Sequence, residues 1–270
     1  MTTLSARPPA VAGMFYPDEP DLLRRTVAHF LSSAPKPQTT PCAVVAPHAG
    51  YRFSGVTAGY AYNGLPAATE ENPRRVFLVG PSHRVYLDGV SVGDYSAFAT
   101  PMGDIPLDLQ TIGWMLTEPD VSNSANPHAM EHSLETQLPF LLESVQHMRL
   151  IPMVYGRISH ERLAQILQTY ASEDDLIVVS SDLSHFHDYD TARRLDSECH
   201  DAVAKQSAEQ MSECEACGRT GVAALIMLAK QRGWRSELAD YRNSGDTAGD
   251  KNRVVGYASY LYFDHTEQAA

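Results

Sequence analysis

The sequence predicts an α/β fold with a mainly parallel central sheet and helices on both faces. Three observations support this class: short apolar runs rich in β-branched residues, helical segments between these runs, and 270 residues of which 43% are hydrophobic. Continuous apolar runs are typical of parallel strands buried on both faces, and strands that alternate with helices build such a sheet. A chain of this length can bury a sizeable core. We therefore expect a single domain over residues 1–270.

Five apolar runs are predicted to be strands. The first four have about the length of one ordinary strand. The last run is longer and could lie antiparallel at an edge of the sheet. The predicted strands are residues 42–46, 75–79, 150–154, 176–179 and 254–263.

Helical segments fall between these strands. Ser54 is suited to cap one of them, because its hydroxyl can accept a hydrogen bond from the first turn. In residues 131–145, leucine and valine recur at spacings of three and four, which places them on one helix face. Pro139 lies inside this segment, so we expect a kink or a break there. The predicted helices are residues 19–31, 54–62, 131–145, 161–170, 191–205 and 220–230.

The composition excludes several classes of protein. The chain carries 33 acidic and 21 basic side chains, and a net charge of −12 argues against a nucleic-acid partner. The mean hydropathy is −0.27, and no apolar run approaches the roughly 20 residues of a membrane helix. Residues 1–9 lack the apolar core of a secretory signal, and four cysteines do not make a disulfide scaffold. We expect a cytoplasmic protein without a membrane partner.

Histidines follow three of the predicted strands. His48 comes after residues 42–46, His83 after residues 75–79, and His185 after residues 176–179, with Asp182 just before it. The carboxyl ends of parallel strands share one edge of a sheet, and ligands of open α/β proteins bind at that edge. We therefore predict that His48, His83 and His185 hold a metal ion. Asp182 would orient a ligand or act as a base.

Each of these residues also has an ordinary interpretation. A lone histidine is more often a surface or capping residue than a ligand. Asp182 could cap the turn that follows it. Three histidines at separate strand ends are harder to dismiss than one, so the functional interpretation is favoured.

Residues 131–135 hold the next candidates. On a helix, His132 and Glu135 would share one face, because they are three positions apart. The second histidine of an HExxH zinc motif is missing, so we expect His132 to transfer protons or to support a ligand. Glu135 could line the site. Glu131 and Glu135 could equally be first-turn acids that favour the helix dipole.

Two further segments carry weaker signals. The polar loop of residues 243–250 could form a wall of the site, with Asp246 or Thr247 reaching a metal or substrate, or it could be an ordinary turn. Cys214 and Cys217 form a CxxC pair with no second pair at zinc spacing. We interpret this pair as structural.

Imidazoles with a nearby carboxylate suit Fe(II), Zn(II) or Cu(II). An iron site with open positions would make the protein a dioxygenase-like oxidoreductase that acts on a small molecule. The same imidazoles could instead serve a zinc hydrolase, in which the metal lowers the pKa of bound water. A third possibility is that the protein binds a peptide or another protein at this edge of the sheet and catalyses no reaction.

Six motifs in the same order resemble the Memo family, whose microbial members are often called AmmeMemoRadiSam system protein B. The resemblance covers nearly the whole chain. The matching motifs are residues 7–17, 46–51, 80–83, 131–135, 180–185 and 244–257.

The resemblance implies a fold similar to class III extradiol ring-cleaving dioxygenases of the LigB type, which hold a non-haem Fe(II). It implies His48, His83 and His185 as the strand-end histidines of that site, beside Asp182. The human family member contributes a cysteine from the loop before the final strand, and Thr247 stands at that position here. The metal or its affinity could therefore differ, or Asp246 could substitute. The human member is also linked to phosphotyrosine-peptide binding, cell motility and metal-dependent redox chemistry.

Overall fold

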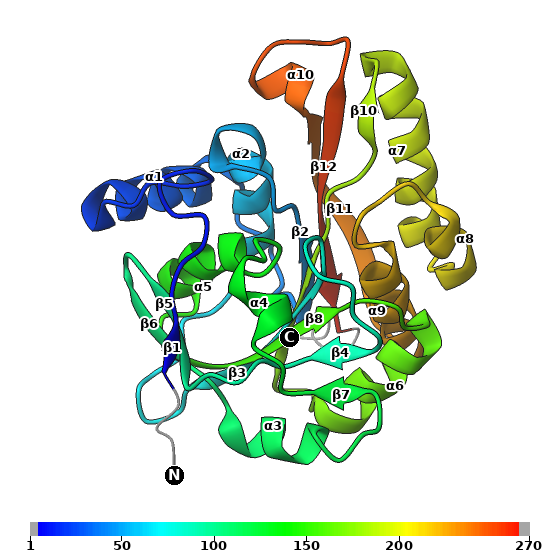
Figure 1. The fold of residues 1–270 in the computed structure, drawn as a ribbon. Helices are drawn as coiled ribbons and strands as arrows, with labels where there is room; N and C mark the ends of the chain where they lie inside the picture. Colours follow the sequence, from blue (N-terminus) through cyan, green and yellow to red (C-terminus); the bar gives the residue numbers. More distant parts are fainter. Residues whose placement is uncertain (1–4, 265–270) are drawn as a thin grey trace.

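A large mixed sheet forms the centre of the molecule. The computed structural model describes residues 5–264, and Figure 1 shows the sheet with helices packed around it. Four neighbouring strands are parallel, with the order β2-β9-β3-β8. Their residues are almost all buried, as expected for strands covered on both faces. These strands are β2 (Ala43–Ala46), β9 (Leu176–Ser180), β3 (Arg74–Pro81) and β8 (Met148–Tyr155).

Antiparallel strands extend the sheet on both sides. On one side β12 (Val254–Phe263) lies antiparallel to β2, and on the other β4 (Val90–Ser91) lies antiparallel to β8. The predicted direction of residues 254–263 is therefore right, but their place at an edge is wrong. β12 is covered by β11 (Arg235–Asn243) and by the short β10 (His185–His187). We missed β11 because its sequence, RSELADYRN, is too polar to resemble a buried strand.

Helices lie on both faces of the sheet, so the predicted fold class is confirmed. In Figure 1, α1 (Pro20–Ser33), α2 (Tyr51–Tyr62) and α5 (Leu138–Ser144) pack together on one side. The other side carries α6 (His160–Tyr170), α7 (Tyr189–Ala204), α8 (Ala208–Glu213) and α9 (Arg219–Arg232).

Several short elements complete the fold, most of them in the segment that joins β3 to β8. A small sheet joins β1 (Ala6–Arg7) near the amino terminus to the hairpin of β5 (Ala97–Thr100) and β6 (Gly103–Pro106). Their two to four residues are too few for a periodic pattern to reveal them. The other short elements are β7 (Val121–Ser122), α3 (Leu109–Met115), α4 (Asn126–Ala129), a 3₁₀ turn η1 (Glu135–Gln137) and α10 (Ser244–Thr247).

Two helix starts differ from the prediction. α2 begins at Tyr51 with Gly50 as its cap, and the Ser54 hydroxyl donates to the Ala49 carbonyl instead of capping. Residues 131–145 do not form one helix. The helical part begins with η1 and continues as α5, in which Pro139 occupies the first turn. Proline is tolerated there because its missing N–H would have no intrahelical partner.

One hydrophobic cluster runs through the described chain, from Val11 to Phe263. Val44, Val178 and Val79, on three adjacent parallel strands, are fully buried in it. This packing fixes the direction of the strand ends and thereby the positions of the loops that follow. Within residues 5–264, no helix combines the length and apolar composition needed to cross a membrane.

Candidate metal centre

Three imidazole rings meet beyond the carboxyl ends of the parallel strands. One ring nitrogen from each of His48, His83 and His132 lies within 4.8 Å of the others. The ring centroids are 5.1 Å apart for His48 and His83, and 4.6 Å apart for His83 and His132. Metal–nitrogen bonds measure about 2.0–2.1 Å, so nitrogens that share one ion lie at most about 4.2 Å apart. Small side-chain rotations would bring these nitrogens onto one ion.

The strand order explains how distant segments meet. β9 lies between β2 and β3, and His48 and His83 each follow their strand by two residues. The two rings therefore flank the end of β9, where Ser180 is the last strand residue. His132 lies in the turn between α4 and η1. The predicted convergence of His48 and His83 is confirmed.

Buried hydrogen bonds hold His48. Its Nδ1 lies 2.8 Å from the Ser180 hydroxyl, and its backbone N–H donates to Oδ1 of Asp182 at 2.7 Å. Burial and, to a smaller extent, the neighbouring His83 imidazole lower the pKa of His48 to about 3. The ring is therefore neutral at pH 7, which is the form that binds metals.

Glu131 organises the other two histidines. Its carboxylate accepts hydrogen bonds from Nδ1 of His83 at 2.9 Å and from the backbone N–H groups of His83, His132 and Ser133. Burial raises the pKa of Glu131, but the hydrogen bonds and charge of His83 outweigh burial and bring it to about 2. A charged carboxylate can only accept, so Nδ1 of His83 carries a hydrogen, and in the neutral form of this ring the lone pair is on Nε2. Carboxylates commonly orient metal-binding histidines in this way.

His132 belongs to the group of potential ligands, although we predicted a supporting or proton-transfer role. Burial and, to a smaller extent, repulsion between protonated forms of His132 and His48 lower its pKa to about 4, so this ring is also neutral at pH 7. Its Nδ1 lies 3.3 Å from the Glu131 carboxylate but makes no hydrogen bond within the described residues. The Phe15 ring covers it, with centroids 5.0 Å apart.

His185 does not join this group, although we predicted it as the third ligand. It lies five residues beyond Ser180, and at about 3.3 Å per residue the chain has room to leave the strand end. The segment turns to pair with β12, with a bulge at Phe186, whose φ is 65°. His185 stays close enough for its charge to lower the pKa values of both His48 and Asp182.

Asp182 lies at the centre, as predicted, and is nearly fully buried. Burial raises the pKa of its carboxyl, whereas the hydrogen bond from His48 acts in the opposite direction. Asp182 accepts a hydrogen bond from the His48 backbone, and its predicted role in orienting a ligand stays a prediction. The same geometry allows it to hold or accept a proton beside the three rings.

Cys217 is a site residue that the sequence analysis missed. Its Sγ lies 3.3 Å from Nε2 of His48, and its backbone N–H donates to the Asp182 carbonyl. Burial raises the pKa of the Cys217 thiol, and the charge of Asp182 adds to this, so the sulfur keeps its proton in the absence of metal. We interpreted the CxxC pair as structural, and the structure places the Cys217 sulfur against a histidine of the candidate centre. Its only sequence signal was its place just before a helix.

Glu135 has a different task from the one predicted. Its fully buried carboxylate accepts hydrogen bonds from the Arg7 guanidinium, the Tyr16 hydroxyl and the backbone N–H groups of Ala10 and Val11. It therefore anchors the amino-terminal segment and does not line the group of histidines.

Asp246 and Thr247 belong to α10. Asp246 accepts a hydrogen bond from the Asn243 backbone N–H, and this bond is part of a capping box at the start of that helix. Asp246 also accepts a hydrogen bond from the Tyr189 hydroxyl. The Thr247 hydroxyl is buried and has no hydrogen-bond partner within residues 5–264. A thiol does lie beside His48, but it comes from Cys217 and not from the loop that holds Thr247.

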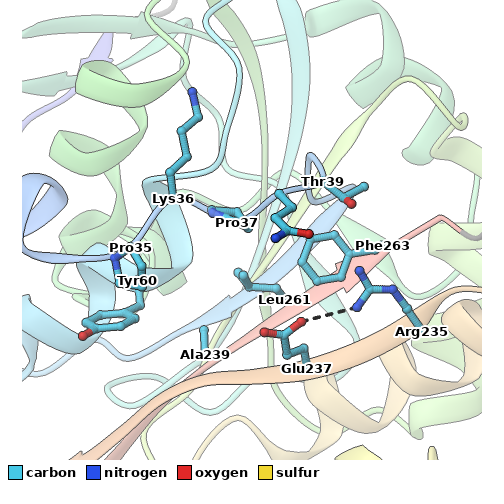
Figure 2. Close-up of a pocket in the computed structure, with 11 residues that line it drawn as sticks. Pro35, Lys36, Pro37, Thr39, Tyr60, Arg235, Glu237, Ala239, Leu261 and Phe263 are labelled. Carbon is cyan, nitrogen blue, oxygen red and sulfur yellow. Dashed lines mark hydrogen bonds and ion pairs between the residues drawn. The ribbon is translucent and has the colours of Figure 1, made fainter. Parts of the chain in front are cut away.

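The centre opens to solvent on the side of His83. The His83 side chain is 28% exposed, against 15% for His132, while His48 is buried. A different cavity of about 660 Å³ lies against the ends of β11 and β12 (Figure 2). Tyr262 of β12 pairs with Ala43, the first residue of β2, so this cavity lies toward the opposite edge of the sheet. Its lining includes Tyr60, Arg235 and Glu237 but none of the candidate ligands.

Comparisons with known proteins identify the family of the chain. A family model described as "Memo-like protein" matches residues 7–261. The chain belongs to the Memo family. It is similar to a "MEMO1 family protein" of Aquifex aeolicus, with 32% identity over 274 residues that cover 96% of this chain and 100% of the relative. A protein of the same description from Archaeoglobus fulgidus is 32% identical, covering 95% of this chain and 99% of its own length. The predicted family is confirmed.

Proposed function

We propose that this Memo-family protein is a metal-dependent oxidoreductase of dioxygenase-like type. A divalent metal would be held by His48, His83 and His132, and a small molecule or a peptide would enter from the exposed side of His83. The proposal depends on one observation above all: a nitrogen of each ring lies within 4.8 Å of the others.

The donor set fits a metal ion. His48 and His132 have lowered pKa values and are neutral at pH 7, and Glu131 binds Nδ1 of His83, so that Nε2 is the nitrogen with which the neutral ring would bind a metal. Glu131 and Asp182 place carboxyl groups next to the three histidines, and these groups would partly balance the charge of a divalent cation. The thiol of Cys217 adds a further potential donor beside Nε2 of His48.

Fe(II) is the metal that we favour, with Cu or Zn as alternatives. Imidazole binds all three, and iron with open positions supplies dioxygen chemistry. Within this site the protein would keep the ligands neutral and oriented. Asp182, whose pKa burial raises, would hold or accept a proton during turnover.

A zinc-dependent hydrolase is the second candidate. The group contains three histidines and no carboxylate as a direct member, and three histidines are also the ligand set of zinc enzymes that activate water. Such an enzyme would work without oxygen.

Metal analysis tests the proposal. Protein purified without oxygen should contain about one equivalent of metal, and His48→Ala and His83→Ala should each lose it. The matched control is His147→Ala, an exposed histidine outside the site, which should keep the metal. Unchanged metal content in both site variants would overturn the proposal.

Oxygen consumption separates the remaining functions. Iron-dependent uptake with catechol-like substrates would support the oxidoreductase. Hydrolysis that continues without oxygen and requires zinc would favour the second candidate. Tight peptide binding without any turnover would identify a binding protein instead.

A further inference from the structure

A chain of buried hydrogen bonds leads from His48 into the interior. Nδ1 of His48 meets the Ser180 hydroxyl at 2.8 Å, and the Gln137 side chain meets the same hydroxyl, also at 2.8 Å. The Tyr62 hydroxyl donates to Oε1 of Gln137 at 2.8 Å. Ser180, Gln137 and Tyr62 are all fully buried, so bulk water cannot replace any of these partners.

The position of the hydroxyl hydrogen follows from the partners of Ser180. A serine hydroxyl has one hydrogen to donate and two lone pairs. Ser180 lies 2.6 Å from the Ser133 carbonyl, which can only accept, so the hydrogen points there. One lone pair accepts from Nε2 of Gln137. Only the second lone pair remains for His48, so Nδ1 of His48 must carry a hydrogen.

The orientation of Gln137 is equally determined. Its side-chain nitrogen faces the Pro47 carbonyl at 3.0 Å as well as Ser180, and its oxygen faces the Tyr62 hydroxyl. The reversed amide would place an oxygen against a carbonyl oxygen, with no hydrogen between them. The amide therefore donates to Ser180, as the assignment above requires.

We propose that Ser180 and Gln137 are positioning residues that hold His48 in the tautomer protonated at Nδ1, which leaves the lone pair of Nε2 free to bind the metal. The metal part of this inference rests on the proposed function. The tautomer part does not, because the hydrogen bonds are internal to the protein.

The contact of Nε2 of His48 with the Cys217 sulfur, at 3.3 Å, fits either tautomer, because the thiol can donate to the Asp182 carbonyl at 3.5 Å instead. The neighbouring ring offers a parallel. Nδ1 of His83 is fixed in the same way by the Glu131 carboxylate. A hydroxyl that receives a hydrogen bond and a carboxylate thus perform the same task on neighbouring rings.

Nitrogen NMR tests the tautomer directly in metal-free, ¹⁵N-labelled protein. Long-range proton–nitrogen spectra distinguish a ring nitrogen that carries a hydrogen from one that does not. The His48 signals are identified by their loss in His48→Gln. We expect a protonated Nδ1 and a bare Nε2, and a protonated Nε2 in the wild-type protein would overturn the proposal.

Substitutions test the two positioning residues. Ser180→Ala removes the acceptor, so His48 should shift toward the Nε2-protonated form, and zinc affinity should fall by about 10–100-fold. Gln137→Met should cause a smaller loss, because Ser180 keeps its hydroxyl, and Ser180→Thr should restore both readouts. The matched control is Ser259→Ala, which removes another fully buried serine hydroxyl whose partner is the Thr57 carbonyl at 2.6 Å. It should change neither readout.

Each result is decisive. If Ser180→Ala leaves the tautomer and the zinc affinity unchanged, the positioning role is wrong. If Ser180→Ala fails to fold, the wild-type spectrum and Gln137→Met still decide the question. If the wild-type tautomer is as expected but no metal binds, the proposed function fails and the metal part of this inference fails with it.

Discussion

Glu131 and Glu135 lie four positions apart and are both buried, yet they serve different parts of the molecule. Glu131 accepts from His83 and from three backbone N–H groups around the histidines. Glu135 accepts from Arg7, Tyr16 and two N–H groups of the amino-terminal segment. The first carboxylate organises a site, and the second fastens a segment of the chain.

The difference lies in the partners. Glu135 faces a permanently charged guanidinium in a fully buried ion pair. Removing the Glu135 carboxylate would leave the buried charge of Arg7 without its partner. Glu131 faces a histidine, which can be neutral, together with backbone donors. Two buried acids of one segment therefore divide stability and site geometry between them, and the predictions below test this division.

The largest effect is expected for Glu135→Ala. Removing one partner of a buried ion pair costs about 3–5 kcal/mol of unfolding free energy. Urea denaturation measures this loss. Glu143→Ala is the control, because its partly exposed carboxylate is 4.0 Å from Arg24 and should contribute less than about 1 kcal/mol. Equal effects of the two variants would contradict the anchoring role.

A smaller and different effect is expected for Glu131→Gln. An amide cannot accept all four hydrogen bonds without turning a donor toward another donor, so His83 loses its fixed orientation. Metal affinity should fall by about 10–100-fold in a competition titration with a chelator. Glu135→Gln is the matched variant and should weaken metal binding much less. If both variants weaken it equally, the proposed division between the two acids is wrong.

Acid should destabilise the metal-free protein through the site. His48 and His132 have folded pKa values of about 3 and about 4, below the roughly 6.5 of an unfolded histidine. Their stabilising contribution is complete above pH 6.5 and is lost as the pH falls toward 4 and 3, because the unfolded chain binds the protons first. Each histidine contributes a slope of at most about 1.4 kcal/mol per pH unit.

Glu131 adds to this loss below pH 4.5, because its folded pKa is about 2. Urea denaturation at several pH values measures the slope. His132→Gln should flatten it between pH 6.5 and 4, whereas the exposed His29→Gln should not. A slope that is unaffected by His132→Gln would contradict the assignment.

The smallest effect is expected outside both regions. Gln146 is exposed and adopts a φ of 65° just after α5, a conformation that costs most side chains energy but not glycine. Gln146→Gly should raise the unfolding free energy by about 0.5–1 kcal/mol. The control is Gln165→Gly, in the middle of α6, which should lower it by about 1 kcal/mol. Destabilisation by Gln146→Gly would show that its side chain contributes more than its backbone costs.

The central strands and most long helices were predictable because their signals are local. The four parallel strands are continuous apolar runs, and the predicted ranges differ from the observed ones by at most two residues at either end. His48 and His83 could be paired because each directly follows such a run. His185 could not be placed in the same way, because the path of residues 181–184 depends on pairing with β12.

The partners of the two acids were beyond prediction. Nothing in the spacing of Glu131 and Glu135 tells which carboxylate meets a histidine and which meets Arg7, more than 120 positions away. The helix expected over residues 131–145 would have placed both acids on one face. The actual turn separates them, because Glu131 lies before η1 and Glu135 begins it.

The sequence by itself determined the class of the fold, the family and two histidines of the candidate centre, since these depend on apolar runs and on residues next to them. Only the tertiary structure decided that His132 completes the group, that Cys217 faces His48, and that Ser180 orients the ring. These contacts join residues from separate loops, and such loops meet only after the sheet has packed and brought its strand ends to one edge.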